Sequence, residues 1–371
     1  MTESFTETSK ISYGTNIKNS FGGCIIGLII FLLAFVVLWK NEGNNVAQIA
    51  KANYIKKTAI EISADKIERE NDNKLVQLSG NAITDTTLSD GIVTLPKVFA
   101  LARKVEMYQW EESVETTSKD ELGGSTTETK TYTYDKVWSG VEINSKNFKK
   151  QNYKNPPFPI KSATLFAKSG KLGEFTLTNK QSQAMHDYTE YDELPPNHKY
   201  KIFENKYYTS INPENPAIGD IRISYGYVPT NTEISIIGRQ KSDNTLTSYS
   251  YKDSPIYLQQ SGEKTKGEMV SAFRKGNRMI TNLFRILGWF MMYIGLNMFI
   301  NPLVVIFKVV PFVESIVGFL TSSVIFLISV ALSLLTISIA WFAYRPFLTL
   351  GVLAVIGLIV YEVKRKMKEQ G

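Results

Sequence analysis

The chain has 371 residues, a formal net charge of +7 and a single cysteine, which excludes an intramolecular disulfide. Residues 41–282 hold 32 Lys plus Arg against 30 Asp plus Glu, so the basic excess lies in the rest of the chain. A nucleic-acid-binding protein would concentrate that excess on a soluble domain, and the balance therefore argues against nucleic acid as a partner.

The N-terminal part predicts a tail followed by a membrane anchor. Residues 1–20 are polar, which is typical of a short disordered tail. Residues 21–39 carry no charge and end at Trp39-Lys40, a pair that suits the headgroup boundary. No small-residue cleavage site follows, so we predict an uncleaved transmembrane helix 1 at 21–39. Cys24 is interpreted as a small apolar filler in this helix, with lipid attachment as the alternative.

Residues 41–282 predict one globular, β-rich domain of mixed α+β type. The domain opens with apolar residues at helical spacing from Val46 to Ile60. Short β-type runs separated by turn residues follow, the clearest at 75–78, 91–95, 130–138, 163–166, 221–227 and 233–238. Residues 113–128, rich in Thr, Ser, Glu and Gly, predict an exposed hairpin or loop. Basic and apolar residues alternate over 267–282, which fits a membrane-surface helix and an ordinary domain helix equally well.

Signals for catalysis are weak throughout this domain. No nucleophile elbow, phosphate loop or dinucleotide fingerprint occurs in a convincing context. The two histidines, His186 and His198, lie in an acidic segment that contains Pro195-Pro196, and their spacing matches no metal motif. We interpret this segment as a solvated loop, with a zinc site as the less favoured alternative. The sequence therefore predicts no enzyme, no cofactor and no metal.

The last third of the chain is strongly apolar and predicts three more membrane spans. A spanning helix needs about 20 mostly apolar residues. Transmembrane helices 2, 3 and 4 are predicted at 283–307, 317–344 and 347–361, and a basic tail follows at 362–371. The predicted fold class is thus a membrane α+β protein, with four transmembrane helices and the large mixed domain inserted between the first and the second.

Polar residues inside the predicted spans are costly in hydrocarbon and need an explanation. Asn297 and Asn301 stand four apart on one face of helix 2. We interpret them as packing contacts between helices, with a permeation path as the alternative. Tyr344-Arg345-Pro346 separates helices 3 and 4. Because a guanidinium stays charged, we expect Arg345 to reach lipid headgroups or the exported domain and to fix that domain against the helices.

Four spans place both termini on one side of the membrane and the middle domain on the other. The positive-inside rule counts short loops and tails. The side of the tails offers Lys10, Lys18, Lys308, Lys364, Arg365, Lys366 and Lys368, against Arg345 in the opposite short loop. Basic residues at the two ends of the domain favour the reverse orientation, but long domains translocate largely regardless of charge. We therefore predict cytoplasmic termini and a periplasmic or lumenal domain.

Several segments, taken in order, resemble one known family. They are Asn41-Glu42-Gly43, Val105-Glu106-Met107-Tyr108-Gln109-Trp110, Tyr132-Thr133-Tyr134 with Trp138, Ile143 to Phe148, Asn215-Pro216, Gly219-Asp220 to Ser224, Gly288-Trp289, Gly295-Leu296-Asn297 and Trp341 to Pro346. On these segments, which cover nearly the whole chain, the sequence closely resembles the LUMA family of four-span nuclear-envelope proteins and its bacterial relatives.

The resemblance implies one span, a large lumenal domain and three clustered spans. It also implies a membrane-organising role without catalysis, homo-oligomers, and binding to other membrane proteins. In eukaryotic members the setting is the endoplasmic reticulum and inner nuclear membrane, with emerin and lamins as partners. The Lys/Asn/Ile-rich texture and the lack of an Asn-x-Ser/Thr acceptor within 41–282 suggest a bacterial or divergent member. In a bacterial member the compartment would be the inner membrane, without nuclear partners.

The matched segments supply the candidate structural or interaction residues, but no catalytic one. These candidates are Met107, Tyr108, Gln109, Trp110, Asn144, Asn147, Phe148, Asp220, Asn297, Asn301, Tyr344, Arg345 and Pro346. The predicted function is a membrane scaffold that gathers partner proteins or membrane lipids. The alternative is a component of a membrane transport or membrane-enzyme complex. A polar cavity joining Asn297, Asn301 and Arg345 would favour the alternative, and a packed bundle would favour the scaffold.

Overall fold

The computed structural model describes residues 3–309, 311–346 and 349–351, together with 354 and 358. The chain forms two compact units. The β-rich unit comprises the described residues up to Glu7, Asn53–Glu115 and Lys130–Ala272. The helical unit comprises Thr8–Ala52, Thr116–Thr129 and the described residues from Phe273 onward. The domain predicted at 41–282 therefore contributes its two ends and one internal segment to the helical unit.

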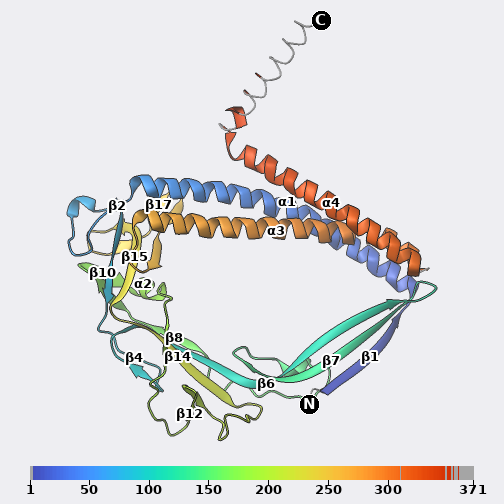
Figure 1. Ribbon diagram of the computed structural model, residues 1–371, viewed down its shortest axis with the longest axis horizontal. Coiled ribbons are helices and arrows are strands. Elements are labelled where there is room, and N and C mark those ends of the chain that lie inside the picture. Colours follow the sequence, from blue (N-terminus) through green and yellow to red (C-terminus); the bar gives the residue numbers. More distant parts are fainter. Residues whose placement is uncertain (1–2, 310, 347–348, 352–353, 355–357, 359–371) are drawn as a thin grey trace. The chain divides into compact units, whose positions relative to one another are not determined.

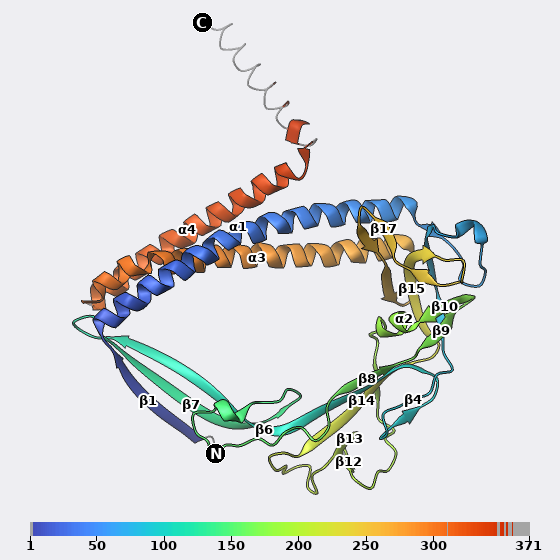
Figure 2. The ribbon, with the colours of Figure 1, turned by 180° about the vertical axis from the view of Figure 1, so that it is seen from behind.

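Three long helices supply most of the helical unit (Figure 1). They are α1 (Tyr13–Thr58), α3 (Lys266–Ile306) and α4 (Pro311–Ala343), with the short 3-10 helix η3 (Phe307–Val309) between the last two. Helices α1 and α3 lie side by side in both views (Figures 1 and 2). They run antiparallel, because Asn41 bonds to Thr281 while Asn45 bonds to Asn277.

Each of these helices carries a stretch long and apolar enough to cross a bilayer, within Tyr13–Thr58, Lys266–Ile306 and Ile316–Ala343. Large apolar side chains remain exposed along them, for example Phe21 (60%), Phe319 (73%) and Leu327 (67%). Helices that are apolar on all faces are typical of membrane spans. The predicted fourth helix at 347–361, apart from isolated positions, and the tail at 362–371 lie outside the described residues.

The N-terminal segment differs from its prediction. Instead of a disordered tail, Glu3–Ile11 form strand β1, and α1 begins at Tyr13. The ring of Phe5 lies 6.0 Å from that of Tyr132, on the strand that pairs with β1. A polar strand of this kind is stabilised by its partner, and the local sequence does not reveal that partner. The helix predicted from Val46 is likewise the continuation of α1, because residues 40–45 between the two contain no proline and a single glycine, which a long helix tolerates.

The larger sheet has eight strands in the order β1-β7-β6-β14-β13-β12, with β11 paired to β14 and β8 paired to β6. Their bounds are β6 (Val98–Asp120), β7 (Thr126–Ser139), β8 (Ala163–Phe166), β11 (Thr189–Tyr191), β12 (Lys201–Phe203), β13 (Lys206–Tyr208) and β14 (Ile221–Pro229). The segment predicted as a hairpin or loop at 113–128 is the distal end of the β6–β7 hairpin, so the hairpin alternative is the one observed.

The second sheet has seven strands in the order β10-β9-β3-β15-β16, with β19 paired to β15 and β2 running parallel to β3. Their bounds are β2 (Ile60–Glu61), β3 (Leu75–Ile83), β9 (Ser169–Leu172), β10 (Phe175–Thr178), β15 (Thr232–Gln240), β16 (Leu246–Thr247) and β19 (Leu258–Ser261). Smaller elements are hairpins β4 (Leu88–Ser89) with β5 (Thr94–Leu95) and β17 (Tyr249–Tyr251) with β18 (Ser254–Ile256), α2 (Asn179–Gln183), and 3-10 helices η1 (Arg69–Asn71) and η2 (Ser145–Asn147).

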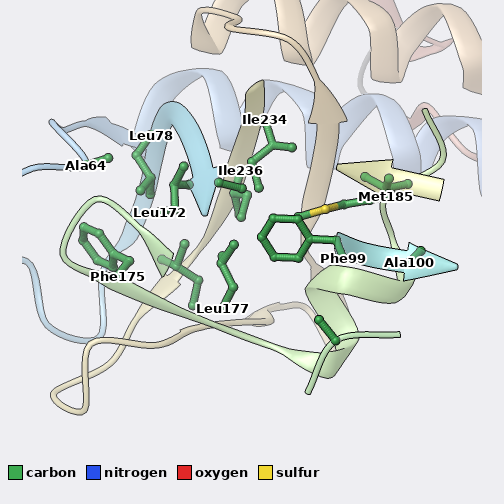
Figure 3. Packing of buried hydrophobic residues seen from close by; sticks show 14 of the residues in the cluster. Ala64, Leu78, Phe99, Ala100, Leu172, Phe175, Leu177, Met185, Ile234 and Ile236 are labelled. Atoms are coloured by element: carbon green, nitrogen blue, oxygen red, sulfur yellow. The ribbon is translucent and has the colours of Figure 1, made fainter. Parts of the chain in front are cut away.

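The main core of the β-rich unit lies on one face of the second sheet (Figure 3). Side chains from β3, β9, β10 and β15 meet Phe99 from β6, and Phe99, Phe175 and Ile236 are fully buried. At Gly170 an added Cβ would lie 2.5 Å from the Phe99 ring, so a larger residue would displace that ring. Apolar residues at alternate strand positions thus build the core as the β-type runs predict.

Candidate functional site

The first matched segment of the β-rich unit lies on β6, where β6 meets the start of β14. Met107 is fully buried and pairs with the first residue of β14. The backbone N–H of Tyr108 donates to the carbonyl of Asp220 (2.8 Å), and its carbonyl accepts from Gly219 (2.9 Å). The Asp220 carboxylate accepts from the backbone N–H of Ala217 (2.7 Å). These contacts form the corner at which β14 begins, and they leave Asp220 engaged in the turn.

The two following residues tie β6 to the segment after β7. Gln109 is fully buried, donates to the carbonyl of Val141 (3.0 Å) and accepts from the N–H of Ile143 (3.0 Å). The backbone of Trp110 both donates to and accepts from the side-chain amide of Asn155, at 2.7 and 2.9 Å. The side chains of Gln109 and Asn155 therefore serve as hydrogen-bond partners for backbone groups of Trp110, Val141 and Ile143.

Asn144, Asn147 and Phe148 close the same region. Asn144 accepts from the backbone N–H two residues on (3.1 Å), and its carbonyl accepts from Asn147 (3.2 Å), so Asn144 caps η2. Phe148 is 7% exposed and packs with Tyr134 and Tyr153, whose rings stack at 4.0 Å. The eight candidate residues of the β-rich unit thus lie near strand ends and turns: Trp110 and Phe148 belong to this aromatic cluster, and Met107 belongs to a second core cluster.

A buried ion pair that the sequence does not single out lies near this sheet. The Asp90 side chain is 5% exposed and that of Arg103 is 12% exposed, with 2.7 Å between Oδ2 and Nη1. Asp90 also accepts from the Tyr225 hydroxyl (2.8 Å) and from the backbone N–H groups of Ile92 and Val93 (2.9 Å each). Burial raises the pKa of Asp90, but these hydrogen bonds outweigh it, so that the pKa lies below its usual value.

Asp90→Asn is therefore expected to destabilise the protein by about 3 kcal/mol at neutral pH, because Arg103 loses its buried partner. A carboxylate whose pKa is lowered in the folded state stabilises above its unfolded pKa, and that stability is lost as pH falls through the folded pKa. The wild type should lose this contribution to stability below about pH 4, and the stability of Asp90→Asn should depend less on pH in that range. Thermal unfolding midpoints from pH 7 to pH 3 measure both effects. The exposed Asp85→Asn is the control, and equal midpoints for the two variants would contradict the assignment.

The acidic segment with the two histidines forms no ligand set in the part of the chain that the structure describes. His186 and His198 are both exposed. Within the described ranges no three His, Cys, Asp or Glu side chains gather closely enough to hold a metal ion. The segment pairs only briefly with the sheet, through β11 and β14.

The helical unit holds a cluster of three charged residues, Glu42, Arg285 and Arg345, called here the arginine–glutamate cluster. The Glu42 side chain on α1 is 0% exposed and receives two hydrogen bonds from Arg285 on α3, at 2.6 and 3.0 Å. Glu42 attracts and Arg285 repels the Arg345 guanidinium, which stacks at 4.5 Å over the Trp341 ring. Nη1 of Arg345 is buried and has no hydrogen-bond partner among the described residues.

Tyr344 and Pro346 position Arg345 at the end of α4. The Tyr344 ring lies 5.9 Å from the ring of Trp39 and directly over Gly43, where an added Cβ would come within 2.5 Å of the phenol. Helix α4 ends at Ala343, and Pro346 opens the next helical residues, as the sequence predicts. Within the helical unit Arg345 feels the charges of Glu42 on α1 and Arg285 on α3, and its expected contact with lipid headgroups or the exported domain stays a prediction.

Asn297 and Asn301 line a different hollow, between α1, α3 and the start of α4. Its volume is about 390 Å³, and Gly23, Thr321 and Ser322 also line it. Asn297 donates to the carbonyl one turn earlier (2.8 Å) and accepts from the Ser322 hydroxyl (3.1 Å). Arg345 does not line this hollow, so the structure does not join the three polar residues in one cavity.

The tip of the β6–β7 hairpin, Thr116–Thr129, contacts the helix ends within the helical unit. Asn16 of α1 donates to the carbonyl of Gly124 (3.0 Å) and to the hydroxyl of Thr126 (2.9 Å). The N–H of Gly123 donates to the carbonyl of Val309 (3.0 Å). Neither this contact nor the Glu42–Arg285 pair was predicted. The available signal for the ion pair was that Glu42 follows the apolar run at 21–39 and Arg285 lies at the start of the run at 283–307.

Long apolar helices, linked by buried polar contacts where their apolar stretches end, together with a β-rich unit define an integral membrane protein of α+β type. The family model for Transmembrane protein 43 matches residues 107–346, and the chain belongs to this family, the LUMA family. The predicted resemblance is thereby confirmed.

Relatives match over most of their length. The chain is 29% identical to Transmembrane protein 43 of Rattus norvegicus, over 95% of this chain and 92% of that protein. It is 28% identical to the Homo sapiens protein, over 98% of this chain and 95% of that protein. It is 24% identical to the Drosophila melanogaster homolog, over 82% of this chain and 84% of that protein. No solved structure matches.

Proposed function

We propose that the chain is a non-catalytic, multi-pass membrane scaffold that organises partner proteins and lipids around its β-rich unit. It would span the membrane four times, with 347–361 as the fourth helix, and form homo-oligomers. The basic tails favour cytoplasmic termini. The setting would be a bacterial inner membrane, or the endoplasmic reticulum and inner nuclear membrane in a eukaryote. Emerin-like and lamin-like partners belong to the eukaryotic setting.

The observation that carries this proposal is the pairing of α1 with α3 through polar side chains. Both helices continue without a break beyond their apolar stretches, and three polar contacts join them there: Asn41–Thr281, Glu42–Arg285 and Asn45–Asn277. Buried hydrogen-bonded side chains fix the register of two helices. A helix pair of fixed register that presents apolar faces to the bilayer fits a scaffold. A transporter would have to change this register during its conformational cycle.

In-membrane photo-crosslinking tests the scaffold role. A photoreactive residue at the exposed Phe319 should capture a reproducible set of membrane proteins, including further copies of the chain. The same residue at Met292, which is 0% exposed, is the control and should capture neighbours within its own chain only. Lipid adducts alone at Phe319 and at Leu327 would contradict a protein-gathering role.

The hollow lined by Asn297 and Asn301 favours a second function, a component of a membrane transport complex. The amide groups of Asn297 and Asn301 lie on the apolar helix α3, and polar side chains within a membrane span often mark a pathway for ions or solutes. Solute or ion leak from vesicles that contain the purified chain, abolished by Asn301→Leu, would support this role over the scaffold.

A further inference from the structure

Helices α1 and α4 form an apolar groove that ends beside the arginine–glutamate cluster. The groove has a volume of about 430 Å³, within the range of small-molecule sites. Phe35, Val36 and Trp39 line it from α1, and Leu335 and Ile339 line it from α4. Its walls are hydrocarbon along their length, because the hydroxyl of the one Thr in the wall bonds to its own helix.

One end of this groove is cationic. Lys40 lines that end and is exposed. The adjacent Trp39 ring contacts Tyr344, so Arg345, the next residue, lies at the same end. Both oxygens of Glu42 bond to Arg285, and the cluster keeps a net positive charge beside Lys40.

We propose that this groove binds one anionic phospholipid, with an acyl chain along the α1–α4 wall and the phosphate between Lys40 and Arg345. Lys40 lines this end of the groove and Arg345 follows Tyr344, which packs on Trp39; phosphate suits a guanidinium because two parallel hydrogen bonds can form. Trp39, Trp341 and Tyr344 mark this level as the headgroup boundary, where such side chains gather. The proposal deepens the scaffold role by naming the lipid class and its site.

The charge balance selects the class of lipid. Lys40 and Arg345 add two positive charges at the rim, and the Glu42–Arg285 pair cancels itself. A phosphatidylglycerol headgroup offers a net negative charge to this rim, whereas phosphatidylcholine brings its own ammonium group. The groove's cationic end thus favours the anionic lipid over the zwitterionic one, and the preference should weaken with salt.

The test measures lipid retention and binding in the full purified chain. Protein in detergent is titrated with phosphatidylglycerol or phosphatidylcholine, and the bound lipid is counted by native mass spectrometry. The wild type should retain one phosphatidylglycerol and prefer it to phosphatidylcholine. Lys40→Gln with Arg345→Gln should bind roughly 30-fold more weakly, the factor for removing two basic groups near a membrane surface. Lys10→Gln with Lys18→Gln, which also removes two positive charges but away from the groove, should bind like the wild type.

A second pair of variants tests the groove itself. Leu335→Trp should fill the wall and abolish retention, whereas Leu334→Trp, equally exposed (58% against 55%) but outside the groove, should not. Equal binding of the two lipids, or unchanged binding in Leu335→Trp or in the double rim variant, would overturn the proposal. So would a disulfide between Leu335→Cys and Ala354→Cys in a Cys24→Ala background, which would show that the chain's own predicted fourth helix fills the groove.

Failure of this proposal is separable from failure of the scaffold role. Photo-crosslinking from Phe319 can be repeated in the Leu335→Trp protein. If protein partners are captured there without retained lipid, the scaffold role holds and does not depend on this lipid. If lipid is retained in the wild type but no partners are captured, the lipid site holds and the scaffold role fails.

Discussion

Gly295→Ala is expected to lower the free energy of unfolding of the helical unit by about 1–3 kcal/mol, because α1 and α3 touch backbone to backbone there. A Cβ at Gly295 would lie 2.7 Å from the amide nitrogen of Phe31 and 2.8 Å from the carbonyl of Gly27. Backbone atoms cannot rotate away as a side chain can, so the two helices must separate. Small residues at such crossings are typical of membrane helix pairs. Thermal unfolding in detergent measures the change.

Gly276→Ala is the matched control on the same helix. Among the described residues, no atom outside the nearby backbone of α3 lies within 4 Å of the Cβ position at Gly276. Alanine is the better helix former by about 1 kcal/mol, so this variant should be as stable as the wild type or more stable. The two substitutions are thus expected to have opposite signs. A shift of the same sign and size in both would mean that the close crossing of α1 and α3 does not contribute.

Glu42→Gln should destabilise the protein by about 3 kcal/mol, because Arg285 then keeps its charge without a partner. This value is at the low end of the range for buried pairs, since the Arg285 side chain is 34% exposed and water screens it in part. Loss of Glu42 also removes the attraction that Glu42 exerts on Arg345. The unfolding midpoint in detergent should fall, and proteolysis of α1 near the end of its apolar stretch should become faster.

A double-mutant cycle separates the pair from the rest of the bundle. Glu42→Gln with Arg285→Gln should be less destabilised than the sum of the two single variants, because neither charge is then left alone. Arg285→Lys should rescue only part of the stability, since lysine keeps the charge but loses the two-pronged geometry. Glu121→Gln removes an exposed pair with Lys119 at 4.0 Å and should cost less than 1 kcal/mol. Additive single and double effects at Glu42 and Arg285 would refute the coupling.

Local patterns in the sequence predicted the elements well where a run is either strongly apolar or alternating. The strand at 163–166 coincides with β8, the apolar run at 21–39 lies inside α1, and the run at 283–307 lies inside α3 except for its last residue, which begins η3. Periodicity failed where stability comes from distant partners. Nothing near β1 in the sequence indicates that its polar residues pair with β7, because the partner lies more than a hundred positions away.

The candidate site shows the same division. The Trp341–Pro346 segment was identified from its resemblance and from its ionisable residue within apolar sequence. The partner of Arg285, by contrast, lies 243 positions away in the chain at Glu42. Spacing along one helix cannot reveal such a pair, since its geometry depends on how two antiparallel helices are aligned. A carboxylate and an arginine just outside two apolar runs were the available clue.

The contact of the hairpin tip with Asn16 determines what a sidedness label would report. Asn16 precedes the apolar stretch of α1, so a thiol at Ser118 in the tip marks the compartment in which α1 begins. The β-rich unit has to be mapped from another position, such as the exposed Ser242. Labels from opposite sides would mean that β6 and β7 cross the level of the bilayer. Glu111 and Glu115 would then need water beside them instead of lipid, in an aqueous gap that other copies of the chain or partner proteins would have to line.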